Sequence, residues 1–380
     1  MNNNQSLILL GVGGGGCQYV ANVKRLYDGP LNALGLDTDQ HAIGNLDGLR
    51  ATLLGGPRLE GLGSGGDLVK GRMAMKDTTE IVQSELEGVR AAVIVTTLGG
   101  GTGGGATPEL LRTLRKMEIP TLCFALLPFS FEPAERRNLA ERVLPQLDEN
   151  ADTVVVVDQS DLWQRADALD KPLPEAREQA SAYFSKGLTL LWRLLFYPGF
   201  IRFDPARLLA LIASRGRARL YLSEATGPDR ATTATAQLIN QINQAAVSAP
   251  PRAVILGISG TEDLRLAEIG TVMDQLSTAL PKGCRLDMGT VLTASEQGSL
   301  NLATLLFETW EESPGNAAIT DPNATTSGLS APKKGRTRNA ARTSKLGYST
   351  GRGRFRDIEP TIFNGEDLDI PTYIRKYITL

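Results

Sequence analysis

A glycine-rich stretch with one threonine has the clearest chemistry in this sequence. Residues 99–105 read Gly-Gly-Gly-Thr-Gly-Gly-Gly, so Thr102 carries the one polar side chain among them. The apolar, β-branched segment Ala91–Thr97 precedes them and is typical of a buried strand, while Pro108 and Glu109 mark a helix start. Backbone N–H groups at a helix N-terminus favour an anion, and glycine lets the backbone approach it. The pattern predicts a phosphate-binding loop, with a mobile turn as the alternative for a lone glycine run.

A second glycine loop, at residues 11–16, follows the predicted strand Leu7–Leu10. Its glycines match GxGxxG, and Asp37 stands at the end of the next predicted strand. This is also the fingerprint of a dinucleotide site with a ribose-binding acid. Taken alone, the loop favours an NAD-dependent oxidoreductase.

A third glycine loop, at residues 61–66, precedes a helix predicted over residues 68–86. Three glycine loops that each precede a helix suggest one nucleotide polyphosphate held from several sides, whereas a dinucleotide needs the first loop alone. The sequence has no GxxxxGK[ST] motif, which excludes an ordinary P-loop.

These motifs resemble those of the tubulin/FtsZ superfamily. Residues 99–105 look like its GGGTG[ST]G signature, with Gly104 where the family has Ser or Thr. Residues 11–18 are similar to the first phosphate loop of the FtsZ branch. Asp37-Thr-Asp39 resembles its NTD segment, and Pro128–Glu132 with Arg136 resembles its PFNFE ribose loop. The likeness extends from Leu7 to Phe307 and resumes at the end of the chain.

The resemblance implies a site for GTP or GDP with Mg²⁺. Asp39 is the implied acid near the metal, although it could instead cap a helix. Glu132 and Arg136 are the implied ribose contacts, with a surface ion pair as the alternative. The implied nucleotide-binding residues are Gly13, Gly14, Gly15, Gly16, Cys17, Gln18, Asp37, Asp39, Gly63, Ser64, Gly65, Gly66, Gly99, Gly100, Gly101, Thr102, Gly103, Gly104, Gly105, Glu132, Arg136 and Tyr183.

The residues that would recognise guanine depart from the family pattern. The family uses an Asn in the first helix, where this chain has Gln18, and an Asp in the central helix. The matching part of the central helix reads Ser181-Ala-Tyr183 and has no carboxylate. Tyr183 could stack on the base, and weaker discrimination for guanine is expected.

The loop that completes hydrolysis in a neighbouring subunit is also altered. The family implies self-assembly into head-to-tail filaments, in which an NxDxxD loop enters the next subunit's site. Here Asp204 matches the first acid and is the expected catalytic residue, but Arg202 replaces Asn and Arg207 replaces the second acid. Cations favour binding of a triphosphate but do not polarise water as a carboxylate does. This resembles the arrangement of β-tubulin, so slow hydrolysis is expected.

The fold class expected is α/β. A Rossmann-like parallel-sheet GTP-binding domain should occupy residues 1–174, a long central helix residues 175–199, and a smaller α/β domain residues 200–312. A loop is predicted over residues 161–174. The predicted strands are 7–10, 31–36, 91–97, 120–127, 153–157, 217–223, 253–259, 285–293 and 301–307. The other predicted helices are 19–27, 205–213, 229–246 and 263–280.

The C-terminal part changes character after Trp310. Residues 313–360 are predicted to form a disordered basic linker, because they are polar and small and 333–356 hold nine basic residues and no acidic one. The linker is expected to be a solvated tether or, alternatively, an electrostatic contact for anionic lipid or a partner. Residues 361–380 should form a partner-binding peptide, because Asp369–Arg375 looks like the family's DIPxFLR. It implies an FtsA-like membrane adaptor that binds residues 367–376.

Composition favours a cytoplasmic protein, and the resemblance implies that it acts at the division site. The net charge of −2 predicts no direct nucleic-acid partner. The three cysteines are scattered and favour a reducing compartment, and no apolar run is long enough to span a membrane. The resemblance thus implies a GTP-binding cytoskeletal protein for bacterial cell division. The alternatives are a non-hydrolysing filament partner of a second, orthodox FtsZ and the oxidoreductase above.

Overall fold

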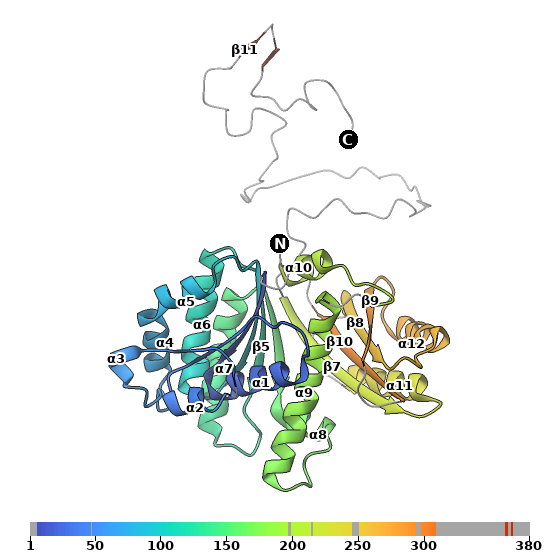
Figure 1. Ribbon diagram of the computed structural model, residues 1–380, viewed down its shortest axis with the longest axis horizontal. Coiled ribbons are helices and arrows are strands. Elements are labelled where there is room, and N and C mark those ends of the chain that lie inside the picture. The colour runs from blue at the N-terminus through green and yellow to red at the C-terminus, as the bar shows by residue number, and fades with distance from the viewer. Residues whose placement is uncertain are drawn as a thin grey trace, which may run out of the picture. The chain divides into compact units, whose positions relative to one another are not determined.

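A ten-stranded sheet runs through the first of two units in the chain, Met1–Thr320 (Figure 1). The computed structural model describes residues 6–46, 48–196, 199–213, 216–244, 251–293, 298–308, 362–363 and 366–367. The strand order is β3-β2-β1-β4-β5-β6-β7-β10-β8-β9, parallel from β3 to β7, with β10 antiparallel to both of its neighbours. The strands are β1 (Leu7–Val12), β2 (Ala33–Asp37), β3 (Ala51–Leu53), β4 (Ala91–Thr97), β5 (Thr121–Leu127), β6 (Thr153–Asp158), β7 (Gly216–Thr226), β8 (Ala253–Gly260), β9 (Arg285–Leu292) and β10 (Ser299–Phe307).

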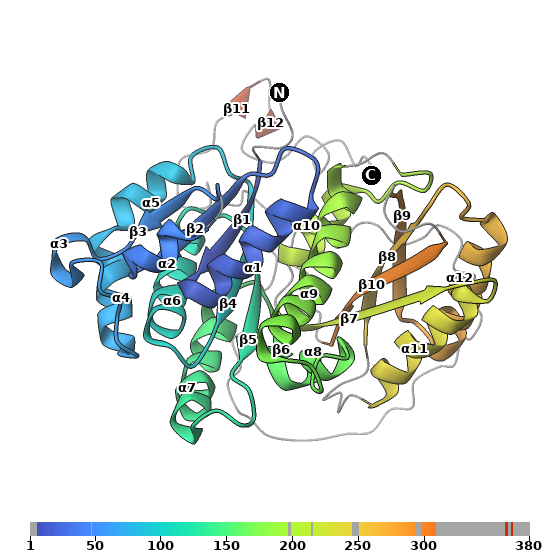
Figure 2. The same ribbon diagram turned by 60° about the horizontal axis from the view of Figure 1, so that its bottom comes forward.

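Helices cover both faces of the sheet, as Figure 2 shows. Helices α1 and α9 share one buried cluster with the sheet, α4–α7 enclose a second on the opposite face of the first half, and α11 and α12 a third against the second half. The helices are α1 (Gly13–Leu26), α2 (Gln40–Gly44), α3 (Gly56–Leu59), α4 (Leu68–Asp77), α5 (Thr79–Glu85), α6 (Gly101–Lys116), α7 (Ala134–Asn150), α8 (Gln159–Arg165), α9 (Leu173–Phe196), α10 (Pro205–Ala213), α11 (Arg230–Gln244) and α12 (Leu266–Ala279). The predicted α/β class is confirmed.

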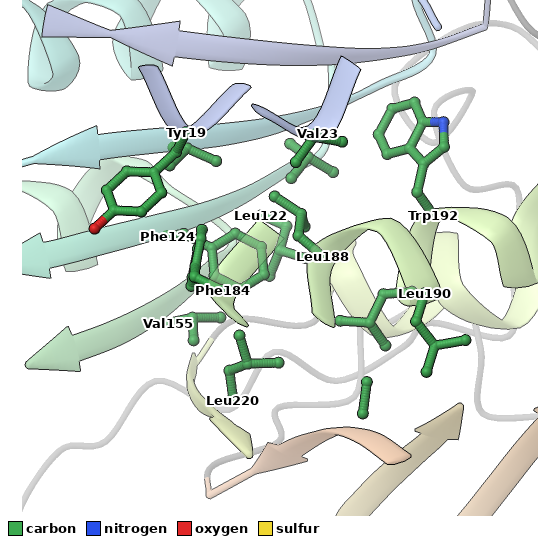
Figure 3. Close-up of a cluster of buried hydrophobic side chains, with 14 of the residues drawn as sticks. Tyr19, Val23, Leu122, Phe124, Val155, Phe184, Leu188, Leu190, Trp192 and Leu220 are labelled. Atoms are coloured by element: carbon green, nitrogen blue, oxygen red, sulfur yellow. The ribbon is translucent and has the colours of Figure 1, made fainter. Parts of the chain in front are cut away.

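Helix α9 ties the two halves of the sheet together. Its Phe184 is fully buried and makes edge-on contacts with Tyr19 of α1 and Phe124 of β5, at centroid distances of 5.0 and 5.9 Å (Figure 3). Farther along, Leu190 and Leu194 contact the position of Gly257 on β8. Burying apolar surface stabilises a fold by about 25 cal/mol per Å², so these large side chains fix α9 firmly against both halves of the sheet. The division of Met1–Thr320 into separate domains at residues 174 and 200 stays a prediction.

Helix α6 begins at Gly101, seven residues before the predicted start at Pro108. Packing explains the difference, because the backbone of α6 lies directly against its neighbours. A Cβ added at Gly103 would lie 2.2 Å from the carbonyl oxygen of Thr97, and one at Gly105 would lie 2.3 Å from that of Leu68. Tertiary contact thus overrides the poor helix propensity of glycine.

Other boundaries also differ from the predictions. Residues 68–86 form two helices, α4 and α5, divided at Thr78, whose hydroxyl donates to Ala74 O and accepts from Gly55 N. The predicted loop at 161–174 is wrong at both ends, because α8 occupies Gln159–Arg165 and α9 starts at Leu173. The carboxylate of Asp158 caps α8 by accepting from Ser160 N at 2.9 Å. Helix α1 begins among the glycines, at Gly13, instead of at Tyr19.

The second unit, Asp321–Leu380, contains two described strands, β11 (Ile362–Phe363) and β12 (Glu366–Asp367). They pair antiparallel, and the sequence between them is Asn-Gly, the preferred dipeptide of a two-residue hairpin loop. The predicted linker at 313–360 and peptide segment 369–376 lie outside the described residues. Within the described part of the chain, no helix is both long and apolar enough to cross a membrane.

Candidate nucleotide-binding site

The glycine loops meet at the carboxyl ends of β1 and β4. Helix α1 starts directly after β1, and α6 starts four residues after β4. The two loops touch, since a Cβ added at Gly13 would lie 3.0 Å from Gly103 N. The third loop touches the loop at 99–105, since a Cβ added at Gly101 would lie 2.5 Å from Ser64 Oγ, and Leu62 forms a bridge with Asp39 after β2. The first N–H groups of α1 and α6 therefore converge on one region, as an anion site requires.

Thr102 connects three of these segments by hydroxyl hydrogen bonds. Its Oγ1 lies 2.6 Å from Thr38 Oγ1, after β2, and 3.0 Å from Ser64 Oγ in the third loop. All three side chains are buried. The predicted phosphate contact of Thr102 stays a prediction, but its hydroxyl already holds the loops in register. The sequence reasoning missed Thr38, whose partner is 64 residues away.

The glycines of the site fall into two classes. A Cβ on Gly101 would lie 2.6 Å from Asp67 N, and those of Gly16 and Gly103 would strike strand carbonyls, so these glycines are required by internal packing. A Cβ on Gly100 would meet nothing within 4 Å, as would those of Gly65 and Gly66. The second class borders open space beside helix N-termini. This side-chain-free cradle fits a phosphate chain.

The two aspartates after β2 differ in environment. Asp37 is 3% exposed, and burial raises the pKa of its carboxyl group; its Oδ1 accepts from Thr38 N at 2.7 Å. Asp39 caps α2 by accepting from His41 N at 2.8 Å and from Ala42 N at 3.3 Å. The capping alternative is therefore observed, while the metal role of Asp39 stays a prediction.

A magnesium ion would need ligands beyond this acid. Among the residues that the structure describes, no group of three or more His, Cys, Asp or Glu side chains could hold a metal. Mg²⁺ is commonly held by one or two carboxylates together with substrate phosphates and water. One carboxylate beside a phosphate cradle fits that requirement.

The predicted ribose-side residues form an ion pair. Arg136 Nη1 lies 2.5 Å from Glu132 Oε2, as the alternative expected, and Arg136 Nε donates to Gly99 O at 3.3 Å. Glu132 Oε1 accepts from Phe129 N at 2.9 Å and so closes its own turn. The pair joins the turn at 129–132 to the glycine loop, and its contact with a ribose stays a prediction.

The sequence reasoning missed Asn22, which lies one turn after Gln18 on α1. Asn22 Nδ2 donates to Ser181 Oγ of α9, and an i, i+4 spacing places both amides on one side of α1. Cys17 is buried, its Sγ donates to Gly11 O at 3.3 Å, and burial raises the pKa of the thiol to about 12. Cys17 is thus held in its thiol form against the backbone.

Tyr183 points across to β7. Its hydroxyl donates to Leu222 O at 2.6 Å, and burial raises the pKa of the phenol to about 12. Its proposed stacking on a base stays a prediction. Three polar groups between α1 and α9 are therefore candidates for recognising a base: the amides of Gln18 and Asn22 and the hydroxyl of Ser181.

Asp204 lies at the other end of the sheet from the glycine loops. It precedes α10, whose Ile212 O accepts from Thr153 Oγ1, at the first residue of β6. Figure 1 shows α10 at the end opposite to α2 and α8, which follow the carboxyl ends of β2 and β6. Asp204 therefore cannot reach the glycine loops of its own chain.

Comparison with known proteins shows which sequences and structures this chain resembles. Residues 6–167 match the family described as "Tubulin/FtsZ family, GTPase domain". The chain is 27% identical over 319 residues to cell division protein FtsZ 2 of Rhizobium meliloti, covering 84% of this chain and 91% of the relative. It is also 27% identical over 288 residues to FtsZ of Methanothermobacter thermautotrophicus, covering 76% and 75% of the two chains.

Solved structures share the fold. The FtsZ dimer of M. jannaschii superimposes with a TM-score of 0.74 at 23% identity, over 80% of this chain and 88% of that chain. CetZ2 from Haloferax volcanii, described as a GTPγS-bound protofilament, gives 0.65 at 21% identity, over 81% and 95%. The family match spans Gly11–Gly16 and Asp37 and so replaces the nicotinamide interpretation of that loop. Residues 6–167 match the GTPase domain of the tubulin/FtsZ family, and the chain has the fold of FtsZ and CetZ.

Proposed function

We propose that this protein binds GTP and GDP at the three glycine loops and assembles head to tail with copies of itself for cell division. The meeting of the loops at Thr102, around the open positions of Gly65, Gly66 and Gly100, carries the proposal. Backbone N–H groups hold the phosphates, and Asp39 assists Mg²⁺. The name of the relative from Rhizobium meliloti and the domain description of the family support cell division and guanine nucleotides.

The placement of Asp204 supports head-to-tail assembly. Because it lies at the opposite end of the sheet, a second copy must supply it to complete a hydrolytic site. Apolar side chains are exposed at both ends: Phe200 is 82% exposed beside Asp204, and Leu62 is 80% exposed beside the glycine loops. Two different surfaces that match each other form a heterologous contact, which propagates into a filament.

A pair of glycine substitutions tests the nucleotide site. The backbone of Gly100, with φ −104° and ψ 163°, suits any residue, and its Cβ would meet open space, so Gly100→Leu should fold normally and block the cradle. We expect at least about a tenfold loss of GTP affinity in a fluorescence titration, as for the loss of a charge-assisted contact. Gly270→Ala is the control, because its Cβ also meets nothing within 4 Å, on α12. Unchanged affinity in Gly100→Leu, or NADH binding in place of GTP binding, would refute the proposal.

Turnover in the assembled protein is expected to be slow. Asp204 supplies one carboxylate, which also accepts from Ala206 N at 2.9 Å, whereas positions 202 and 207 carry arginine. A guanidinium does not act as a general base for water. Mixed filaments with an orthodox FtsZ would be expected to hydrolyse faster than filaments of this chain alone, measured as phosphate release per subunit.

The C-terminal peptide is proposed as the anchor to a membrane-bound adaptor in the cytoplasm at the division site. The linker predicted from sequence over residues 313–360 separates this peptide from the sheet. A flexible chain of that length spans on the order of 40 Å, and a tether is useful where its end binds something. Deletion of residues 369–380 should leave GTP-dependent assembly intact and abolish recruitment to vesicles coated with an FtsA-like adaptor. If the truncated protein is recruited equally well, the basic stretch 333–356 is the anchor.

A further inference from the structure

The loop between α9 and α10 is fixed on a rigid support. Ile201 N donates to Thr290 Oγ1 at 2.9 Å, and Thr290 N donates to Ile201 O at 3.0 Å, so the loop runs beside the edge strand β9. Two residues on, Phe203 is 6% exposed and packs at the position of Gly289. These contacts hold the loop on both sides of Arg202.

Alternate residues of this loop face solvent. Phe200, Arg202 and Asp204 are exposed, while Ile201 is half-buried and Phe203 is buried. In an extended segment, residues two apart project to the same side. Arg202 and Asp204 therefore project together from a short segment that is anchored on β9, at the end of the first-half strands opposite to the glycine loops.

The two arginines of this region differ in their partners. Arg207 Nη1 forms an ion pair with Asp287 Oδ1, and Arg285 Nε lies 2.8 Å from the other oxygen of that carboxylate. Asp287 is 8% exposed, so it holds Arg207 from within the fold. For Arg202, by contrast, no ion pair or side-chain hydrogen bond occurs with any residue in the described ranges.

We infer that Arg202 binds the terminal phosphate of a triphosphate held by the glycine loops of a second copy of this chain. Its backbone is anchored on both sides, and its guanidinium is exposed and has no partner in the described part of the chain. Exposed guanidinium groups bind phosphate oxygens bidentately. A diphosphate lacks the group that this arginine contacts. Assembly therefore depends on the third phosphate, whereas Arg207 serves the fold through Asp287. The inference rests on the proposed function and adds the residue that senses the nucleotide state.

Sedimentation of the full chain tests this role. We measure the critical concentration for assembly with a non-hydrolysable GTP analogue and with GDP. In the wild type it should be at least about tenfold lower with the analogue, a difference typical of one charge-assisted contact. Arg202→Ala should bring the two values to within about threefold, while Arg207→Ala, the matched control, should keep the wild-type ratio.

Three results would overturn the inference. One is a wild-type ratio near one, and another is an unchanged ratio in Arg202→Ala. The third is an equal loss of assembly with both nucleotides in Arg202→Ala, which would mean that Arg202 contacts protein. Nucleotide affinity is measured separately, below the critical concentration, in wild type and Arg202→Ala. If the wild-type monomer binds no GTP, the proposed function itself fails; if only Arg202→Ala loses affinity, the trans contact is refuted.

Discussion

The two ends of the first-half strands use different chemical groups of the chain, backbone at one end and side chains at the other. At the carboxyl end the proposed phosphate contacts come mainly from backbone N–H groups, and glycine is required because strand and helix backbones touch there: a Cβ on Gly103 would lie 2.2 Å from Thr97 O. At the opposite end of the first-half strands, the loop backbone is fixed by Thr290 of the edge strand β9, and the exposed side chains of Arg202 and Asp204 carry the chemistry. Substitution at the first end thus threatens the fold, whereas substitution at the second can alter catalysis and leave the fold intact.

The largest effect is expected at the carboxyl end, from Gly103→Ala. The added Cβ meets the backbone of Thr97, which cannot move without disturbing β4, so overpacking should lower the free energy of unfolding by about 3 kcal/mol or more. Urea denaturation measures the loss. Gly100→Ala is the matched control, since its Cβ meets open space. Equal stability of the two variants would contradict the division of the glycines into two classes.

In the loop that carries Arg202 and Asp204, restoring the family's pattern should raise turnover without loss of the fold. Arg202→Asn with Arg207→Asp supplies the missing groups, and Asp287→Asn must accompany them, because Asp287 would otherwise face a carboxylate in place of Arg207. We expect GTP hydrolysis in assembled protein to rise at least about tenfold, at the low end of general-base effects.

Phosphate release is measured above the critical concentration. Adding Asp204→Asn to the triple variant should return hydrolysis to the wild-type rate, which shows that the gain depends on the loop's carboxylates. No gain, with assembly intact, would place the limit on turnover at the carboxyl end of the sheet instead.

The local motifs of the chain could be predicted from sequence. The strand at Ala91–Thr97 and the helix at Pro205–Ala213 have the predicted bounds, because apolar runs bounded by glycine or proline are local signals. The convergence of the glycine loops followed from the rule that parallel strands present their carboxyl ends at one edge. These features depend on neighbouring residues, which sequence displays directly.

Contacts between distant residues could not be predicted. Arg207 meets Asp287 from 80 positions away, so sequence showed a free cation where the structure has an ion pair. Asn22 and Ser181 are 159 positions apart, and Thr38 and Thr102 are 64 apart. The early start of α6 has the same cause, since the glycines of the helix are stabilised by packing on β4 and α4.

A smaller effect is expected from the buried acid at the carboxyl end. Burial raises the pKa of Asp37 above its ordinary value of about 3.9, so the folded state binds this proton more tightly than the unfolded state does. Stability from Asp37 is therefore fully present below about pH 4 and is lost as the pH rises through the raised pKa. Without nucleotide, Asp37→Asn should gain Tm relative to wild type as the pH increases from about 4 to 7.

Thermal melts at pH 4.5 and pH 7.5 give this difference, and Asp39→Asn is the control. Asn caps a helix about as well as Asp, so the contact that Asp39 makes with α2 should survive. A difference between Asp37→Asn and wild type that does not change with pH would show that the Asp37 carboxyl gains enough from Thr38 N to offset its burial.

The smallest effect should come from Gly104→Ser, which restores the residue type of the family signature. A Cβ at this position would lie 2.6 Å from Leu68 Cδ2, the end of a flexible side chain that can rotate away, and 3.4 Å from Val143 Cγ2. Serine is the better helix former by about 0.5 kcal/mol, which offsets part of the repacking cost. The free energy of unfolding should therefore change by less than about 1 kcal/mol.

At the adjacent position, Gly105→Ser places the Cβ 2.3 Å from the backbone oxygen of Leu68, so the same substitution should cost several times more. Parallel urea titrations of the two variants measure whether a side-chain neighbour and a backbone neighbour differ in this way. A large loss in Gly104→Ser would mean that Leu68 is held as rigidly as the backbone, and that the carboxyl end of the sheet tolerates no added side chain between α4 and α6.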